Sequence, residues 1–175
     1  MSLKNKLHKV VVLHPILFAI FPVAFLYSIN LHTLVLADIL LPISLIVTVT
    51  FLLWFLLRYL FKSTEKSGLL VSVYLALFFK YGHIFFFING FEVGDFEIGR
   101  HRFLLIIYVA LIIIASYYFT KTKRKLVSPT TIANYISATL FVIILVNIGT
   151  YYLENNYIYD TDATAEKYPF DVSGI

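Results

Sequence analysis

The sequence predicts an all-α fold: a polytopic membrane protein with a bundle of about five transmembrane helices. Its composition is the first reason, because 60% of the 175 residues are hydrophobic and 14% are charged, against about 45–50% and 25% in soluble domains. The second reason is that the apolar residues form blocks of about 20 residues, the length at which an α-helix crosses the hydrocarbon core. Most charged residues stand in short connections between these blocks.

Five segments have the length and composition of a span. They are about Val10–Ile29, Ile39–Phe61, Gly68–Ile88, Phe103–Phe119 and Ile132–Tyr152. Pro22, near the middle of the first segment, is expected to kink that helix. The basic residues before the first segment resemble the start of a signal peptide, but the apolar run is too long and no small-residue cleavage pattern follows it. We therefore interpret it as a retained span.

The distribution of Lys and Arg predicts the orientation. The N-terminal segment and the second and fourth connections carry three, two and four basic residues, whereas the first connection has none and the segment after Tyr152 has one. The positive-inside rule then places the N-terminus in the cytoplasm and the C-terminus outside. Residues 153–175 are predicted to be a short, acidic, extracytoplasmic tail that is partly disordered.

The third connection departs from this charge pattern. It should lie outside, yet it ends in Arg100 and Arg102. Basic residues are disfavoured on the outer side of the membrane, so their presence there suggests a functional role. Pairing with the neighbouring acids, together with snorkelling of the long side chains to the interface, is a sufficient alternative.

Lys80 and His83 are the polar residues of the third span that stand out. Three residues apart, they share one face of a helix, and Lys80 would lie about 12 Å below the outer end of that helix. An ionisable side chain at this depth faces a bundle interior or a wet cavity by default, which predicts a polar pocket that opens outward and binds an anion. In the alternative, the helix breaks at Gly82, Phe85–Phe87 lie in the interface, and Lys80 pairs with an acid of the next loop. The acids available for that pairing are Glu92, Asp95 and Glu97.

The segment Gly99-Arg100-His101-Arg102 comes directly before the fourth span. Arginine forks bind phosphate through paired hydrogen bonds, and a helix N-terminus itself favours anions. Together with Lys80 and His83, these residues predict a basic cluster at the outer headgroup level that binds a lipid phosphate. Alternatively, they are snorkelling anchors that contact any nearby anionic lipid.

Several other kinds of chemistry are excluded or weakly indicated. The absence of Cys excludes disulfides, thiolate metal sites and thiol nucleophiles. We predict no catalytic residue, no metal site and no cofactor. Ligation of a haem or pigment by His83 and His101 is an option of low weight, since no carboxylate stands at ligand spacing. His14 and His32 are expected to serve helix-end packing or interfacial hydrogen bonding. The basic residues behind the net charge of +4 lie at the ends of the spans, so this charge does not predict nucleic-acid binding.

Three stretches carry a resemblance to a known family. They are the His14-Pro15 start of the first span through Tyr27, the Phe79–His83 segment with its Tyr-Gly-His, and Gly99-Arg100-His101-Arg102. They resemble the N-terminal membrane domain of sulfatase-like membrane proteins of the alkaline-phosphatase superfamily. These are prokaryotic proteins broadly similar to lipoteichoic acid synthases and phosphoethanolamine transferases. The resemblance implies a helical membrane domain in a cytoplasmic (inner) membrane, followed by an extracytoplasmic metal-dependent catalytic domain. No such domain follows Tyr152 here, so no catalytic residue is carried over.

The sequence therefore predicts a non-catalytic membrane module resembling that domain. It is expected to engage anionic lipid head groups or a partner at the outer face, through Lys80, His83, Arg100, His101 and Arg102. An alternative is a small structural or accessory subunit of a larger membrane protein complex. A weaker alternative is a transporter or an intramembrane enzyme. The expected partners are membrane lipids and other membrane protein subunits.

Overall fold

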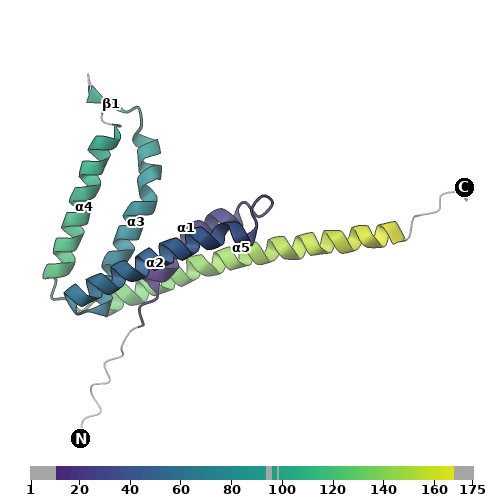
Figure 1. The fold of residues 1–175 in the computed structure, drawn as a ribbon, viewed down its shortest axis with the longest axis horizontal. Coiled ribbons are helices and arrows are strands. Elements are labelled where there is room, and N and C mark those ends of the chain that lie inside the picture. The colour runs from purple at the N-terminus through teal and green to yellow at the C-terminus, as the bar shows by residue number, and fades with distance from the viewer. Residues whose placement is uncertain (1–10, 94–95, 98, 168–175) are drawn as a thin grey trace, which may run out of the picture.

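The computed structural model describes residues 11–93, 96–97 and 99–167, with the backbone alone for 92–93, 96–97 and 156–167 (Figure 1). The predicted all-helical architecture is confirmed in this part of the chain. Its helices are α1 (His14–Ser28), α2 (Leu36–Phe61), α3 (Thr64–Ile88), α4 (His101–Lys121) and α5 (Val127–Lys167). Between α3 and α4, the two-residue strands β1 (Glu92–Val93) and β2 (Phe96–Glu97) pair antiparallel, with Glu92 opposite Glu97.

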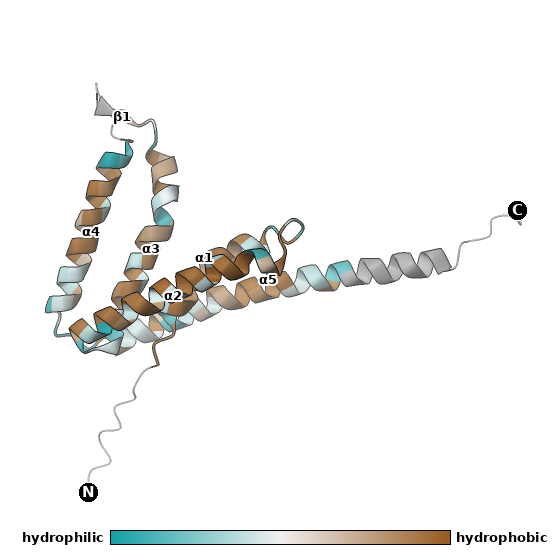
Figure 2. Ribbon diagram, viewed as in Figure 1, coloured by the Kyte–Doolittle hydropathy of each residue, from teal (hydrophilic) through white to brown (hydrophobic). Residues whose placement is uncertain are grey.

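Four of these helices are long and apolar enough to cross a membrane. They are α2, α3 and α4, with 26, 25 and 21 residues, and the 29-residue part of α5 from Val127 to Asn155. Long stretches of the α2, α3 and α4 ribbons are brown, the colour of hydrophobic residues (Figure 2). The first helix differs from the prediction, because α1 has 15 residues instead of about 20. At about 1.5 Å per residue it is roughly 22 Å long, short of the hydrocarbon core of about 30 Å.

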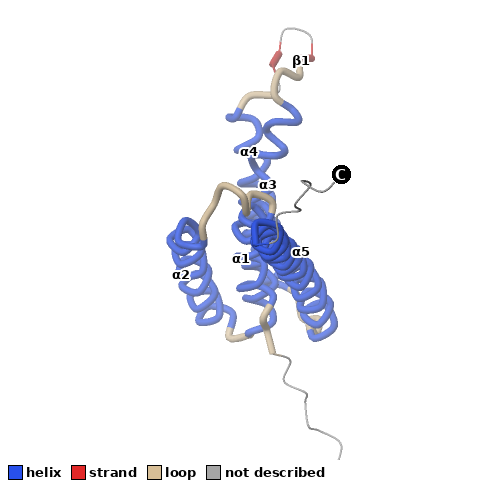
Figure 3. The backbone as a smooth tube through the Cα atoms, turned by 90° about the vertical axis from the view of Figure 1, so that its right-hand side faces the viewer, coloured by secondary structure: helices blue, strands red, loops and turns tan. Residues whose placement is uncertain are grey.

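Helix α1 lies at the centre of the molecule and packs against α2, α3 and α5. The core between these helices is built around Ala19, Leu57, Leu70, Val71 and Leu75, all buried. Helices α3 and α4 form a hairpin that rises away from α1, α2 and α5 (Figures 1 and 3). Because α4 packs chiefly against α3, most of its apolar surface remains exposed. Only 11% of the residues in its most apolar stretch are buried.

Both ends of α1 are held by amide side chains of α5. The backbone N–H groups of Leu13 and His14 donate to Asn134 Oδ1, each at 3.0 Å, and Asn134 Nδ2 donates to the carbonyl of Val11 at 2.6 Å. At the other end, Asn147 Nδ2 donates to the carbonyl of Ser28 at 3.1 Å. Helix ends leave backbone groups without intrahelical partners, and lipid offers none. These two asparagines therefore satisfy backbone groups that the ends of α1 leave without intrahelical partners.

Gly68 permits the close approach of α1 to α3. A Cβ atom placed there would lie 2.5 Å from Val12 Cγ1 and 3.5 Å from both His14 Nε2 and Pro15 Cγ. Real Cβ atoms do not tolerate the first of these distances. The segment that leads into α1 therefore packs directly on the backbone of α3, and the Val12 side chain must shift to admit any side chain at position 68.

Helix α5 runs past Tyr152, where the sequence predicted the span to end, and reaches Lys167. Its 41 residues correspond to about 61 Å, roughly twice the hydrocarbon thickness. Between Gly149 and Lys167 the sequence has no Pro or Gly to interrupt the helix. Hydrophobicity marks where a span leaves the hydrocarbon, but it does not mark where a helix ends.

Candidate functional site

The predicted site lies at the turn between α3 and α4. Helix α3 continues without a break through Gly82 to Ile88, so the alternative in which the helix breaks at Gly82 is wrong. The turn is tight: Gly90 has a positive φ of 79°, and a Cβ atom on Gly99 would meet the carbonyl oxygen of Ile88. Glycine at these two positions lets the chain reverse and brings Arg100 next to the end of α3.

His101 is the residue by which the two helices meet at this turn. Its ring stacks on Phe85, with ring centroids 3.5 Å apart and planes 11° apart. It also lies nearly parallel to the Tyr81 ring, at 6.1 Å, and the Tyr81 hydroxyl is 3.2 Å from His101 Nδ1. Tyr81 in turn makes an edge-to-face contact with Tyr108 at 5.0 Å. The imidazole is thus a packing group that fixes the start of α4 on α3.

The two arginines flank this packed imidazole. Arg100 is the residue before the first turn of α4, and its carbonyl accepts from the N–H groups of Phe103 and Leu104. The guanidinium of Arg102 lies 5.0 Å from the centroid of the Phe103 ring. Both arginine side chains are exposed. The stacking of His101 therefore holds two exposed cationic side chains at the N-terminus of α4.

Lys80 and His83 lie on a different face of α3. Tyr81 and Phe85 face α4, and at about 100° per residue Lys80 and His83 point roughly 120° and 180° away from that direction. Both are exposed, so Lys80 does not lie in an enclosed polar pocket. His83 Nδ1 is 3.2 Å from the carbonyl of Phe79 in its own helix.

The structure thus resolves the five predicted residues into two groups. Arg100, His101 and Arg102 lie on the α4 side, Lys80 and His83 lie on the outward face of α3, and the rings of Tyr81 and Phe85 separate them. The side chains of Glu92, Asp95 and Glu97, the proposed partners of Lys80, lie outside the described residues. Sequence reasoning missed Tyr81 and Phe85, although their i, i+4 spacing is the signal of a shared helix face.

A second polar cluster lies at the opposite end of α3, around His14. His14 is fully buried, and its Nδ1 atom is 2.7 Å from Ser72 Oγ. Its Nε2 atom has no hydrogen-bond partner and lies beside Gly68. The expectation that His14 serves helix-end packing is confirmed. Among the residues with described positions, no three His, Asp or Glu side chains gather in a way that would hold a metal ion.

Comparisons of the chain with protein-family models, curated proteins and solved structures give no match.

Proposed function

We propose that this chain is a non-catalytic integral membrane module that binds anionic lipid head groups at the α3–α4 turn. The observation that carries the proposal is the pair of exposed arginines, Arg100 and Arg102, on either side of the stacked His101. Arginines and aromatic rings can bind and orient a phosphate, and they supply no nucleophile.

The local chemistry favours a lipid phosphate as the anion. The first turn of α4 presents a helix N-terminus, whose partial positive charge adds to that of the arginines. Phe86 and Phe87, near the end of α3, are 86% and 89% exposed, and aromatic side chains at a helix end are typical of the headgroup region. The arginines would therefore lie at the level of the lipid phosphates.

The orientation and the membrane belong to the same proposal. The distribution of Lys and Arg supports an extracytoplasmic α3–α4 turn, and the resemblance to sulfatase-like membrane domains supports a prokaryotic cytoplasmic membrane. In those proteins the membrane domain stands beside chemistry on lipid-linked head groups. We propose that this chain supplies the head-group contact while a partner supplies the chemistry.

The test is binding of phosphatidylglycerol by the purified chain, measured by native mass spectrometry against phosphatidylcholine. The variant with Arg100→Gln and Arg102→Gln is expected to lose at least about tenfold in affinity, because each charge-assisted contact contributes about 1.5–3 kcal/mol. The matched control is Lys123→Gln with Arg124→Gln, which makes the same change of charge at the other end of α4. Equal losses in the two variants would show general electrostatic attraction and would contradict the proposal.

Lys80 and His83 are tested separately, because they lie on another face of α3. Lys80→Gln is expected to reduce phosphatidylglycerol binding less than the arginine pair does. A larger loss with Lys80→Gln would move the binding site to the outward face of α3 and contradict the assignment to the arginines.

A second candidate function is an accessory subunit of a larger membrane complex, and the splayed hairpin favours it. Of the residues in the most apolar stretch of each helix, only 6% in α2 and 11% in α4 are buried within the chain. Faces of this kind suit packing against the helices of other subunits. Solubilisation in a mild detergent, followed by identification of co-purifying chains, tests this function. A single isolated chain would contradict it.

A further inference from the structure

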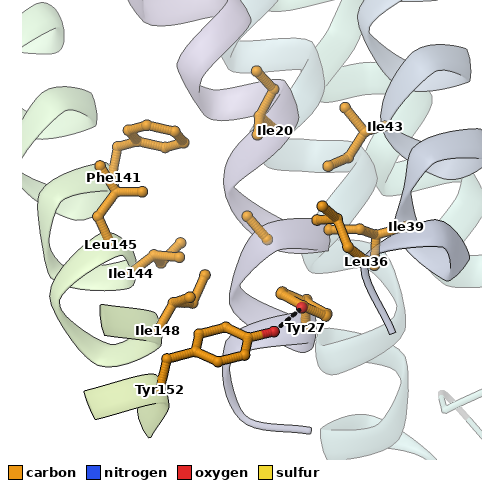
Figure 4. A pocket seen from close by; sticks show the side chains of 11 residues that line it. Ile20, Tyr27, Leu36, Ile39, Ile43, Phe141, Ile144, Leu145, Ile148 and Tyr152 are labelled. Atoms are coloured by element: carbon orange, nitrogen blue, oxygen red, sulfur yellow. Dashed lines mark hydrogen bonds between the residues drawn. The ribbon is translucent and has the colours of Figure 1, made fainter. Parts of the chain in front are cut away.

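An apolar groove lies between α2 and α5, with α1 as its floor (Figure 4). Its volume is about 350 Å³. Ala24 of the floor and Ile39 and Ile144 of the walls are 7%, 9% and 2% exposed, whereas Leu36 and Leu145 at the rim are 60% and 53% exposed. The groove is therefore open along one side, and its inner surface is part of the packed bundle.

The polar side-chain atoms of the lining are two hydroxyls at one end. Tyr27 on α1 and Tyr152 on α5 approach to 3.1 Å between their hydroxyl oxygens (Figure 4). One hydroxyl hydrogen is used in this contact, so the other is available to donate to an acceptor. The remaining lining residues are Ile, Leu, Ala and Phe. This pattern fits an amphiphile with an acceptor at one end of a hydrocarbon chain.

The length of the groove matches one leaflet of a bilayer. Along α5 it extends from Phe141 to Tyr152, which at 1.5 Å per residue is about 16 Å, close to half of the hydrocarbon core of about 30 Å. Its walls belong to two helices of spanning length. The tyrosine pair lies where α1 ends at Ser28, next to the connection to α2. The hydroxyls thus stand at the boundary of the hydrocarbon, and the groove runs inward from them.

The groove is open along one side, and its packed walls are apolar apart from the two hydroxyls at one end. Left empty, its walls would lose their dispersion contacts.

We propose that this groove binds one acyl chain of a glycerophospholipid, with the ester carbonyl accepting a hydrogen bond from the Tyr27–Tyr152 hydroxyl pair. The proposal is independent of head-group binding at the α3–α4 turn, because it involves other helices and needs no charge on the lipid. A neutral phospholipid therefore tests the groove alone.

The experiment uses the full chain in nanodiscs that contain phosphatidylcholine with a diazirine near the end of one acyl chain. After photolysis, we expect labelled peptides from α1, α2 and α5 that carry the lining residues. Leu145→Trp, which fills the rim, is expected to reduce this labelling several-fold. The matched control, Leu105→Trp, changes a residue of α4 that is 57% exposed and should leave the labelling unchanged.

A second variant tests the polar end without filling the groove. Tyr27→Phe combined with Tyr152→Phe removes both hydroxyls and should weaken lipid retention about two- to tenfold in native mass spectrometry, as expected for the loss of one hydrogen bond. Labelling of α4 as strong as that of the groove peptides would show only annular lipid and overturn the proposal. Groove peptides that carry no lipid adduct would also overturn it.

Discussion

Asn134 shows how one polar residue can determine where a helix begins inside a membrane protein. Its side chain contacts three backbone groups at the start of α1, more than 115 residues away in sequence. Without it, two N–H groups and one carbonyl at the start of α1 would lose their side-chain partner. His14 at the same position is buried against Ser72, so the start of α1 rests on polar groups from both α3 and α5.

Replacing Asn134 by Ala is expected to destabilise the fold by about 0.5–1.5 kcal/mol, the net contribution of a typical hydrogen bond. The effect is measured as the change in the free energy of unfolding on SDS titration in mixed micelles. Asn134→Asp keeps the acceptor oxygen and should cost less. Asn30→Ala is the control, because Asn30 Nδ2 bonds only within its own turn, to Leu26. Equal stability of Asn134→Ala and the unmodified chain would contradict this role.

Gly68 and Gly82 form a matched pair within one helix. Gly68→Ala places a Cβ atom 2.5 Å from Val12 Cγ1 and should destabilise by about 1–3 kcal/mol, because the Val12 side chain must shift. Gly82 has nothing within 4 Å of the corresponding position, so Gly82→Ala should stabilise by about 0.5–1 kcal/mol through helix propensity. Thermal unfolding of both variants in the same detergent gives the comparison. Opposite signs are expected, and destabilisation by Gly82→Ala would contradict an unbroken α3.

At the scale of elements, the α3–α4 hairpin is held by contacts between polar and aromatic side chains. The hydroxyls of Tyr74 and Ser116 are 2.6 Å apart near the middle of the pair, and His101 stacks on Phe85 at the turn. Lys66 Nζ donates to the carbonyl of Thr122 at 2.7 Å, which satisfies a carbonyl at the end of α4. These contacts hold α4 although it packs chiefly against one neighbour.

The stacked imidazole gives a prediction for the hairpin. His101→Ala should loosen the turn by about 0.5–1.5 kcal/mol, the contribution of an aromatic pair, and should weaken phosphatidylglycerol binding because the arginines lose their support. His101→Phe keeps the stack and should retain most of the binding. Native mass spectrometry of the two variants tests this. If His101→Phe lost as much binding as His101→Ala, the imidazole itself would contact the ligand.

The extent of each element shows what the sequence could and could not predict. Hydrophobic blocks located α2, α3 and α4 to within a few residues, because transfer into hydrocarbon fixes the length of a span. The early end of α1 depends on Asn134 and Asn147, which reach it from a distant part of the chain. The separation of Lys80 from Arg102 depends on which face of α3 meets α4. Residue spacing within α3 shows only how its side chains point relative to one another. The contact of Tyr81 and Phe85 with His101 shows which of these faces is turned toward α4.

At the scale of the whole molecule, the helices form a compact group around α1 and a hairpin that rises from it (Figure 3). The arginines lie at the α3–α4 turn, at the tip of the hairpin (Figure 1), and the tyrosine pair lies at the groove lined by α1, α2 and α5. The proposed orientation counts α1 as a crossing, and on that count both lie toward the extracytoplasmic side. One face of the membrane would then offer a head-group site and a chain site.

The side of the membrane on which the α3–α4 turn lies is therefore the decisive property, and single-cysteine labelling measures it directly. The chain has no Cys, so each introduced thiol reports alone. Asn89→Cys at the end of α3 should react with a membrane-impermeant maleimide in intact cells. Arg124→Cys, between α4 and α5, should react only after the cells are permeabilised. Labelling of Arg124→Cys in intact cells, with Asn89→Cys protected, would contradict an extracytoplasmic head-group site.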